Sequence, residues 1–297
     1  MTGVLPPTVH YLSAPADFQE KETCYLRARR LEGRVLSDEE VARLPSALHP
    51  LPSALNQEWL WRRRSYQRLQ KFLLKKQPNN SATQQPNNSQ QPNNPATQQP
   101  NNSQQPNNPA TQQLTILDLG CGNGWMANRL AEQPGWDIWA VDLNEAELAQ
   151  GARCFGRPNL RFVYADVLAG VLPQGYFDVV VLAASVQYFP DLSALWAALR
   201  NTLAVNGEIH IIDSHFYPDE TARAAARQRT ADYYARLGAP EMAAFYHHHL
   251  WADAVAAGAE NLNRHWPARL LQKVKWLAPF PWLRIAGRPS IFAAKKA

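Results

Sequence analysis

Between Leu114 and Asp213 the chain alternates strand-like and helix-like segments, and this alternation constrains the fold more than any other feature of the sequence. The strand-like runs are TILDLG (115–120), DIWAVD (137–142), LRFVYAD (160–166), FDVVVLAA (177–184) and GEIHIID (207–213). Helical patterns follow the first run to about residue 132 and cover 144–154 and 192–203. Such alternation predicts a doubly wound α/β fold, in which helices cover both faces of a mostly parallel sheet.

The end of the chain predicts a different kind of strand pairing. In PWLRIAGRPSIFAAKK, the turn Gly287-Arg288-Pro289 separates two short extended runs. A turn of this composition between two extended runs is typical of a hairpin. We therefore expect a C-terminal antiparallel hairpin that brings the sheet to seven strands.

A low-complexity tract divides the chain. Residues 77–113 alternate the units QQPNNS and QQPNNPAT, which contain almost no apolar side chains. Without apolar surface to bury, such a tract cannot offset its ordering entropy, and its prolines disfavour both helix and strand. We predict a disordered linker at 77–113, between an N-terminal helical segment (1–76) and a main domain (114–297).

The N-terminal segment contains one strong helical pattern, at residues 54–76. Trp59, Tyr66, Leu69 and Leu73 recur at helical spacing. Two interpretations remain open: the helix packs against the main domain, or it acts as a lid over an active site.

The sequence DLGCGNG (118–124) follows the first strand and opens a helix. Its alternate glycines allow a tight turn and a close approach to a ligand, and amide groups at a helix start face that ligand. A dinucleotide-binding fingerprint would place the third glycine at position 125, where this chain has Trp125.

Two carboxylates end the next two strands. Asp142 lies 18 residues after Gly124 (142 − 124 = 18). It can accept hydrogen bonds from the ribose hydroxyls of an adenosine-containing ligand, or it can cap the following helix. Asp166 can accept from an adenine amino group, beside the backbone amide of Val167; alternatively it simply starts a loop.

Together LDLGCGNG, VDLN, FVYADV, FDVVVLAASVQYFPD and LAVNGEIHIID resemble the class I S-adenosylmethionine (SAM) dependent methyltransferases, in particular the type 11 branch. The resemblance covers about residues 114–213 and implies a Rossmann-like fold with SAM as cofactor. It implies that Gly120, Gly122, Asn123 and Gly124 cradle the methionine portion of SAM and that Asp118 orients its amino group. It also implies that Asp142 binds the ribose and that Leu143, Asp166 and Val167 contact the adenine. Ala183 would touch the cofactor through its backbone.

This chain departs from the family pattern at two positions. Tyr188 stands where many relatives have histidine, and Asn206 precedes Gly207 where a second glycine is common. Residues 1–76 and 214–276 lie outside the shared core, and resemble the variable elements that shape substrate pockets in this family. We expect 214–276 to be a helical cap, interrupted at Gly238-Ala239-Pro240.

Tyr188 and His215 are the candidate catalytic residues, since both follow strand ends where ligands bind in doubly wound sheets. A structural role for His215 is the alternative. His247-His248-His249 falls in a helical pattern, so the three side chains point in different directions and do not form one metal site. We expect no metal.

Methyl transfer to a small-molecule acceptor is the function that these features favour. A nucleotide-binding oxidoreductase, a non-catalytic SAM-binding protein and a nucleic-acid methyltransferase are the alternatives. The basic end with Trp266, Trp276 and Trp282 is compatible with weak peripheral membrane contact or with a solvated face. Three separated cysteines, no signal-peptide pattern and no run of roughly 20 apolar residues lead us to expect a cytoplasmic protein. Oligomeric state stays open.

Overall fold

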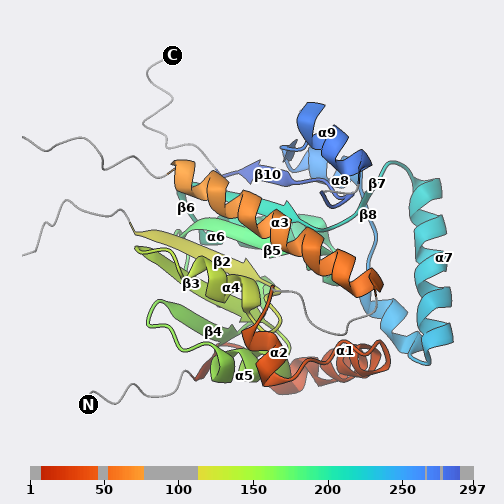
Figure 1. Cartoon of the computed structure of the whole chain (residues 1–297), viewed down its shortest axis with the longest axis horizontal. Helices are drawn as coiled ribbons and strands as arrows, with labels where there is room; N and C mark the ends of the chain where they lie inside the picture. Colours follow the sequence, from red (N-terminus) through yellow and green to blue (C-terminus); the bar gives the residue numbers. More distant parts are fainter. Residues whose placement is uncertain (1–7, 46–52, 77–112, 265, 275–276, 288–297) are drawn as a thin grey trace, which may run out of the picture.

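The computed structural model describes residues 8–45, 53–76, 113–264, 266–274 and 277–287. Its centre is an eight-stranded sheet in the order β1-β4-β3-β2-β5-β6-β10-β9 (Figure 1). Parallel pairing joins β1 (Val9–Tyr11), β4 (Leu160–Tyr164), β3 (Trp136–Asp142), β2 (Leu114–Leu119), β5 (Phe177–Ala183) and β6 (Leu203–Ile212). The predicted doubly wound α/β fold is therefore confirmed, with β2 and β5 meeting where the strand order reverses direction.

The two sheet edges differ from the seven-stranded expectation. β1 comes from the N-terminal segment and pairs with β4; its three residues are too few to show a strand pattern. At the other edge, β10 (Leu283–Ala286) runs antiparallel to β6 and to the two-residue β9 (Glu260–Asn261). The first arm of the expected hairpin is thus an antiparallel strand, while the second arm lies outside the described residues.

Helices cover both faces of the sheet. On one face lie α4 (Trp125–Leu130) and α5 (Glu145–Cys154), and on the other lies α6 (Leu192–Thr202). Two buried clusters follow from this, one on each face, because successive strand side chains point to opposite sides. Burial on both faces explains why the central strands are nearly continuous apolar runs.

The N-terminal segment packs on the same face as α4 and α5. It forms α1 (Gln19–Leu31), α2 (Asp38–Ala42) and α3 (Ser53–Lys76), preceded by a short 3-10 helix η1 (Pro15–Phe18). Tyr66, Leu69 and Leu73 of α3 are buried in the core of this face, and α3 runs across the sheet in Figure 1. The helix predicted at 54–76 is confirmed, and its C-terminal half packs on the domain.

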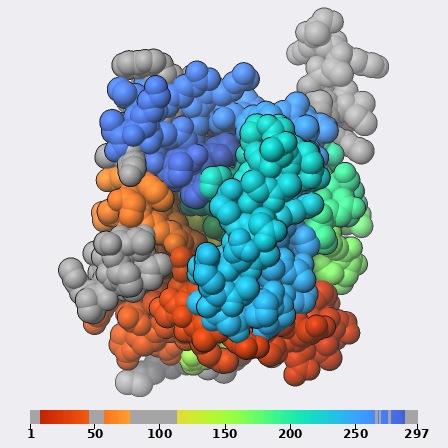
Figure 2. Space-filling view, turned by 90° about the vertical axis from the view of Figure 1, so that its right-hand side faces the viewer, coloured from red at the N-terminus to blue at the C-terminus, as the bar shows by residue number. Residues whose placement is uncertain are grey.

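The region after β6 adds elements beside the sheet and on one of its faces. It contains β7 (Phe216–Tyr217), α7 (Glu220–Leu237), the 3-10 helix η4 (Pro240–Phe245), β8 (His249–Leu250), α8 (Trp251–Ala256) and α9 (Trp266–Lys273). Figures 1 and 2 show α7 standing at one side of the molecule. As expected, the helix stops before Gly238, which adopts a left-handed φ of 86°.

His247 and its two neighbours do not lie on a helix, contrary to the expectation. The helix breaks at Pro240, and only the short 3-10 helix η4 lies between this break and the histidines. His247 and His248 are therefore in a loop, and His249 starts β8. Within the described part of the chain, no cluster of three or more potential metal ligands occurs. No helix in that part is long and apolar enough to cross a membrane. Almost all of the predicted linker, residues 77–112, lies outside the described residues.

Candidate functional site

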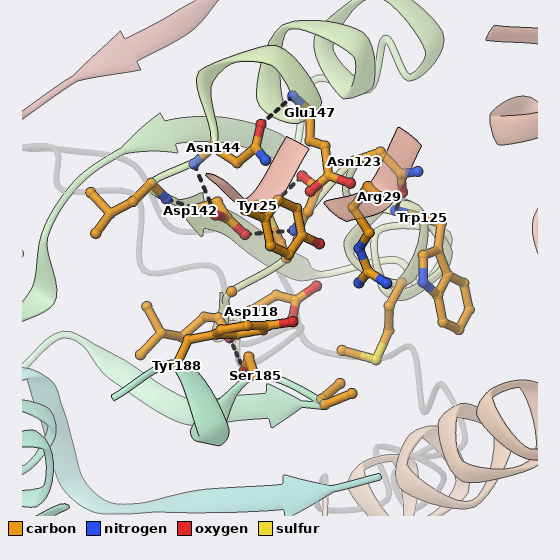
Figure 3. Close-up of a pocket in the computed structure, with 18 of the residues that line it drawn as sticks. Tyr25, Arg29, Asp118, Asn123, Trp125, Asp142, Asn144, Glu147, Ser185 and Tyr188 are labelled. Carbon is orange, nitrogen blue, oxygen red and sulfur yellow. Dashed lines mark hydrogen bonds between the residues drawn. The ribbon is translucent and has the colours of Figure 1, made fainter. Parts of the chain in front are cut away.

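A pocket of about 190 Å³ opens at the carboxyl ends of β2, β3, β4 and β5 (Figure 3). This is the crevice where open parallel sheets bind ligands. Two sets of residues line it. We call the strand-end set the floor: Asp118 to Asn123, Asp142 to Asn144, Ala165 to Val167 and Ala183 to Ser185. We call the N-terminal set the roof: Lys21, Glu22, Tyr25, Arg29, Gly33, Arg34, Leu36, Glu58, Trp59 and Arg62.

The glycine-rich loop forms the centre of the floor. Gly120 and Gly124 have φ values of 74° and 71°, in the left-handed region that favours glycine. A Cβ atom on Gly120 would overlap the Cβ of Ser185, and one on Gly124 would overlap the ring of Phe162. The glycines therefore serve the packing of the loop against its own protein as well as access for a ligand.

Asp118 sits at the bottom of the pocket. It is 1% exposed, and its Oδ2 has no hydrogen-bond partner among the described residues. Burial raises the pKa of Asp118 to about 7, and the charge of Asp142 adds to the rise, against a hydrogen bond from the Ala127 backbone. A buried, unpartnered carboxyl oxygen beside a cavity is suited to receive a cationic donor, such as the ammonium group of SAM.

Asp142 holds the loop against the end of β3. One carboxylate oxygen, Oδ2, accepts from the backbone N–H of Gly122 at 2.7 Å. The other, Oδ1, accepts from the N–H groups of Leu143 (2.7 Å) and Asn144 (2.9 Å). Asn144 caps α5, with its Oδ1 accepting from Glu147 N–H at 3.0 Å. Asp142 is therefore not the N-cap residue, and its position fits the predicted ribose ligand.

Burial raises the pKa of Asp142, and the three backbone hydrogen bonds, together with the charge of Lys21, oppose that rise. Lys21, on α1, donates a hydrogen bond to the carbonyl oxygen of Tyr188 at 3.1 Å. Burial lowers the pKa of Lys21, against the charges of Asp142 and Asp166. A roof lysine therefore lies near the carboxylates of both Asp142 and Asp166.

The remaining predicted cofactor residues line the same pocket. Leu143, Asp166, Val167 and Ala183 all contribute to its floor. Asp166 also caps a short 3-10 helix, η2 (Val167–Ala169), by accepting from Leu168 N–H at 2.9 Å. The structure thus brings all ten predicted cofactor residues to one loop cluster, nine of them on the pocket wall and Gly124 at the start of α4. Their individual ligand roles stay predictions.

The two predicted catalytic residues are separated. Tyr188 lines the pocket and meets the ring edges of Tyr25 (5.7 Å between centroids) and Tyr246 (6.0 Å), and burial raises its pKa. His215 is exposed and does not line the pocket; it packs against Phe280 (4.5 Å) and Tyr217 (5.8 Å). Only Tyr188 is therefore placed to touch a ligand in this pocket.

Asp213 is a pocket residue that the sequence analysis did not single out. It follows β6, has a left-handed φ of 55°, and its Oδ1 accepts from Ser65 Oγ at 2.6 Å. Burial raises the pKa of Asp213 to about 6, against its hydrogen bond with Ser65 and the charge of Arg62. The signal was available, because Asp213 ends a predicted strand just as Asp142 and Asp166 do.

Glu147 and the roof residues were also missed. Glu147 belongs to α5, and its carboxylate lies over Gly122. Burial raises the pKa of Glu147 to about 7, the charge of Arg29 opposes this, and that of Asp142 adds to it. For α1 no local signal existed, since it shows no motif and reaches the pocket only through the tertiary fold, whereas α3 belongs to the helix for which a lid was one of the two interpretations.

Comparisons with known proteins agree with this geometry. Residues 116–207 match the family model of a methyltransferase domain. An uncharacterized methyltransferase of Mycobacterium tuberculosis is 29% identical over 97 residues, covering 33% of this chain and 49% of that protein. A demethylmenaquinone methyltransferase of Thermus thermophilus is 34% identical over 101 residues, covering 33% of this chain and 46% of that protein. The chain thus spans about half the length of the curated relatives it matches.

Among solved structures, an S-adenosylmethionine-dependent methyltransferase from Mesorhizobium loti is 28% identical over 33% of this chain and 45% of that chain, with a TM-score of 0.32. The family assignment therefore rests on the matched sequence segment, which coincides with the strands that form the pocket floor. The matched segment, the glycine-loop spacing and the free Oδ2 of Asp118 in the pocket together support a class I S-adenosylmethionine-dependent methyltransferase domain, with the family match confined to residues 116–207.

Proposed function

We propose that the protein transfers a methyl group from SAM to a small-molecule acceptor. One observation carries the proposal: carboxylates from three neighbouring strand ends line a single pocket that the N-terminal helices cover. A pocket with a floor and a roof admits a compact acceptor more readily than a folded macromolecule. Its roof also limits the access of water to the reacting groups.

The residues of the floor fit the parts of SAM. Asp118 offers a free carboxyl oxygen for the ammonium group, and Asp142 and Asp166 lie at the next two strand ends for the ribose and the adenine. Bound SAM supplies an electrophilic methyl group on a sulfonium. The protein's task is to hold the acceptor in line with that group and to keep it there.

The acceptor side is formed by aromatic and apolar residues. Tyr25 and Trp59 of the roof, Tyr188 and Phe189 from the loop after β5, and Met242 of η4 line this part of the pocket. Such a lining favours a small acceptor with an aromatic or apolar portion. An acceptor that loses a proton on methylation needs a group to receive it. Asp213, with its pKa of about 6, is ionised at neutral pH and lines this pocket, so it can receive that proton; Tyr188 lines the pocket as a neutral phenol, because burial raises its pKa.

Named relatives support a small acceptor without identifying it. A nocamycin O-methyltransferase of Saccharothrix syringae is 35% identical over 101 residues, 32% of this chain and 35% of that protein. A trans-aconitate 2-methyltransferase of Deinococcus radiodurans is 36% identical over 91 residues, 29% of this chain and 33% of that protein. These matches support the shared cofactor core, while residues 8–76 and 214–287 set the acceptor.

The proposal is tested with methyl-labelled SAM and a panel of carboxylic acids, phenols, amines and thiols, beside tRNA and unfolded peptide. We expect label in at least one small molecule, and none with Asp118→Asn, which removes the charge but keeps the shape of the side chain. Label only in RNA or peptide would contradict a small-molecule acceptor. Tight SAM binding without transfer to any acceptor would favour a non-catalytic SAM-binding protein.

A further inference from the structure

Three arginines and two glutamates of the roof form a chain of alternating charge. Along it, Arg29 contacts Glu32, Glu32 contacts Arg34, Arg34 contacts Glu58, and Glu58 contacts Arg62. The chain links the end of α1 to α3, and its three guanidinium groups line the pocket. Within this chain three arginines share two glutamates, so one arginine has incomplete ion pairing; the charge of Glu147 also acts on Arg29, but the two form no ion pair within 4 Å among the described residues.

The distances identify Arg29 as that arginine. Arg62 donates to Glu58 from Nε (3.0 Å) and pairs with it through Nη2 (2.8 Å), and Arg34 contacts both glutamates. Arg29 contacts Glu32 through Nη1 alone, at 3.2 Å. Glu32 also forms an ion pair with Arg34 at 3.4 Å and accepts a hydrogen bond from Tyr233 Oη at 2.8 Å. Since a guanidinium has five N–H donors, Arg29 keeps donors for another anion.

Arg29 is held in place and directed into the pocket. Its guanidinium lies over the ring of Tyr25, with 4.9 Å from Cζ to the ring centroid. Figure 3 shows Arg29 and Asp118 extending into the same space, Arg29 from the roof and Asp118 from the floor. Among the described residues, Asp118 Oδ2 has no partner, so the two groups present an open anion and an open cation donor across one cavity.

This pair matches the two charges of an amino acid. We infer that Arg29 binds the carboxylate of the methionine end of SAM while Asp118 binds its ammonium group. The inference rests on the proposed function, because it needs SAM in this pocket. It adds a roof residue to a cofactor site otherwise formed by strand ends, so that cofactor binding holds α1 against the floor. Glu32 is then a positioning residue, which orients Arg29 and connects it to Tyr233 on α7.

The test compares two ligands that differ only in the carboxylate. SAM and decarboxylated SAM are titrated calorimetrically into the full chain and into Arg29→Gln. A charge-assisted hydrogen-bond pair contributes roughly 1.5–3 kcal/mol, so we expect Arg29→Gln to weaken SAM by about 10- to 100-fold. Decarboxylated SAM should change by less than about threefold, since it has no group for Arg29 to bind.

Two further variants control for folding and for general charge. Arg30→Gln changes the next residue of α1, which is exposed and does not line the pocket, and should leave both affinities unchanged. Arg29→Lys keeps the charge but not the forked donors, and should weaken SAM less than Arg29→Gln does. An unchanged SAM affinity in Arg29→Gln, or equal losses for both ligands in both Arg29 variants, would overturn the inference. Failure of the unmodified chain to bind either ligand would instead refute the proposed function.

Discussion

The floor and the roof of the pocket are built in different ways. The floor is formed by loops that directly follow β2, β3, β4 and β5, so each residue is positioned by its own strand and by local backbone hydrogen bonds. The roof is formed by α1 and α3, which reach the pocket through contacts between segments far apart in the chain, such as Trp59 with Trp125. Local rules therefore determine the cofactor chemistry, while long-range packing determines what else shares the pocket.

The largest effect is expected from Asp142→Ala in the floor. The substitution removes the predicted ribose ligand and the acceptor for three backbone N–H groups at 2.7–2.9 Å. We expect SAM affinity, measured by calorimetry, to fall by about 100-fold or more. Asp191→Ala is the control: it removes the helix cap of α6, away from the pocket, and should lower stability without changing SAM affinity. Equal affinities for both variants would show that the floor does not bind SAM as described.

The rigidity of the floor is tested by Gly120→Ala. The new Cβ overlaps Ser185, and the left-handed φ of 74° adds strain. We expect a loss of about 2–4 kcal/mol in the free energy of unfolding in urea. Gly170→Ala is a matched control, because Gly170 has a similar φ of 68° but nothing within 4 Å of its Cβ position, and should lose only about 1 kcal/mol. Similar losses in both would assign the whole cost to backbone strain.

The floor also predicts a pH dependence of cofactor binding. In the free protein the pKa of Asp118 is about 7, and an ammonium partner lowers it in the complex. Binding is then at full strength above pH 7 and is lost as the pH falls below 7, because the carboxyl must give up a proton to bind. We expect S-adenosylhomocysteine affinity to be roughly tenfold weaker at pH 6 than at pH 8. Asp118→Asn should flatten this profile; an unchanged profile would assign it to Glu147, whose pKa is also about 7.

The smallest effect is expected in the roof, from Trp59→Ala. Trp59 meets Trp125 edge to face at 5.6 Å, so its loss opens the roof without removing a ligand contact in the floor. We expect SAM affinity to fall by about 3- to 10-fold. Leu60→Ala, on the same helix at a side chain that is 41% exposed, should have no effect. A loss as large as that of Asp142→Ala would mean that roof and floor act as one unit.

The same contrast explains how far the sequence predicts the structure. The five central strands and the 54–76 helix were predictable because period and composition identify them locally. Asp118, Asp142 and Asp166 were predictable because each lies at or just beyond the carboxyl end of a buried strand in this topology. β1 was not, because three residues carry no pattern, and His215 was misleading, because a strand-end position does not say which way the chain then turns. Arg29 was hidden for a similar reason, since only the packing of α1 brings it to the pocket.

The measurement that tests the central claim most directly is calorimetric titration of the full chain with SAM, S-adenosylhomocysteine and NADH, beside Asp118→Asn. We expect SAM and S-adenosylhomocysteine to bind at one site, Asp118→Asn to weaken both, and NADH not to compete with them. Binding of NADH in preference to SAM, or SAM binding that Asp118→Asn leaves unchanged, would contradict the assignment of this pocket.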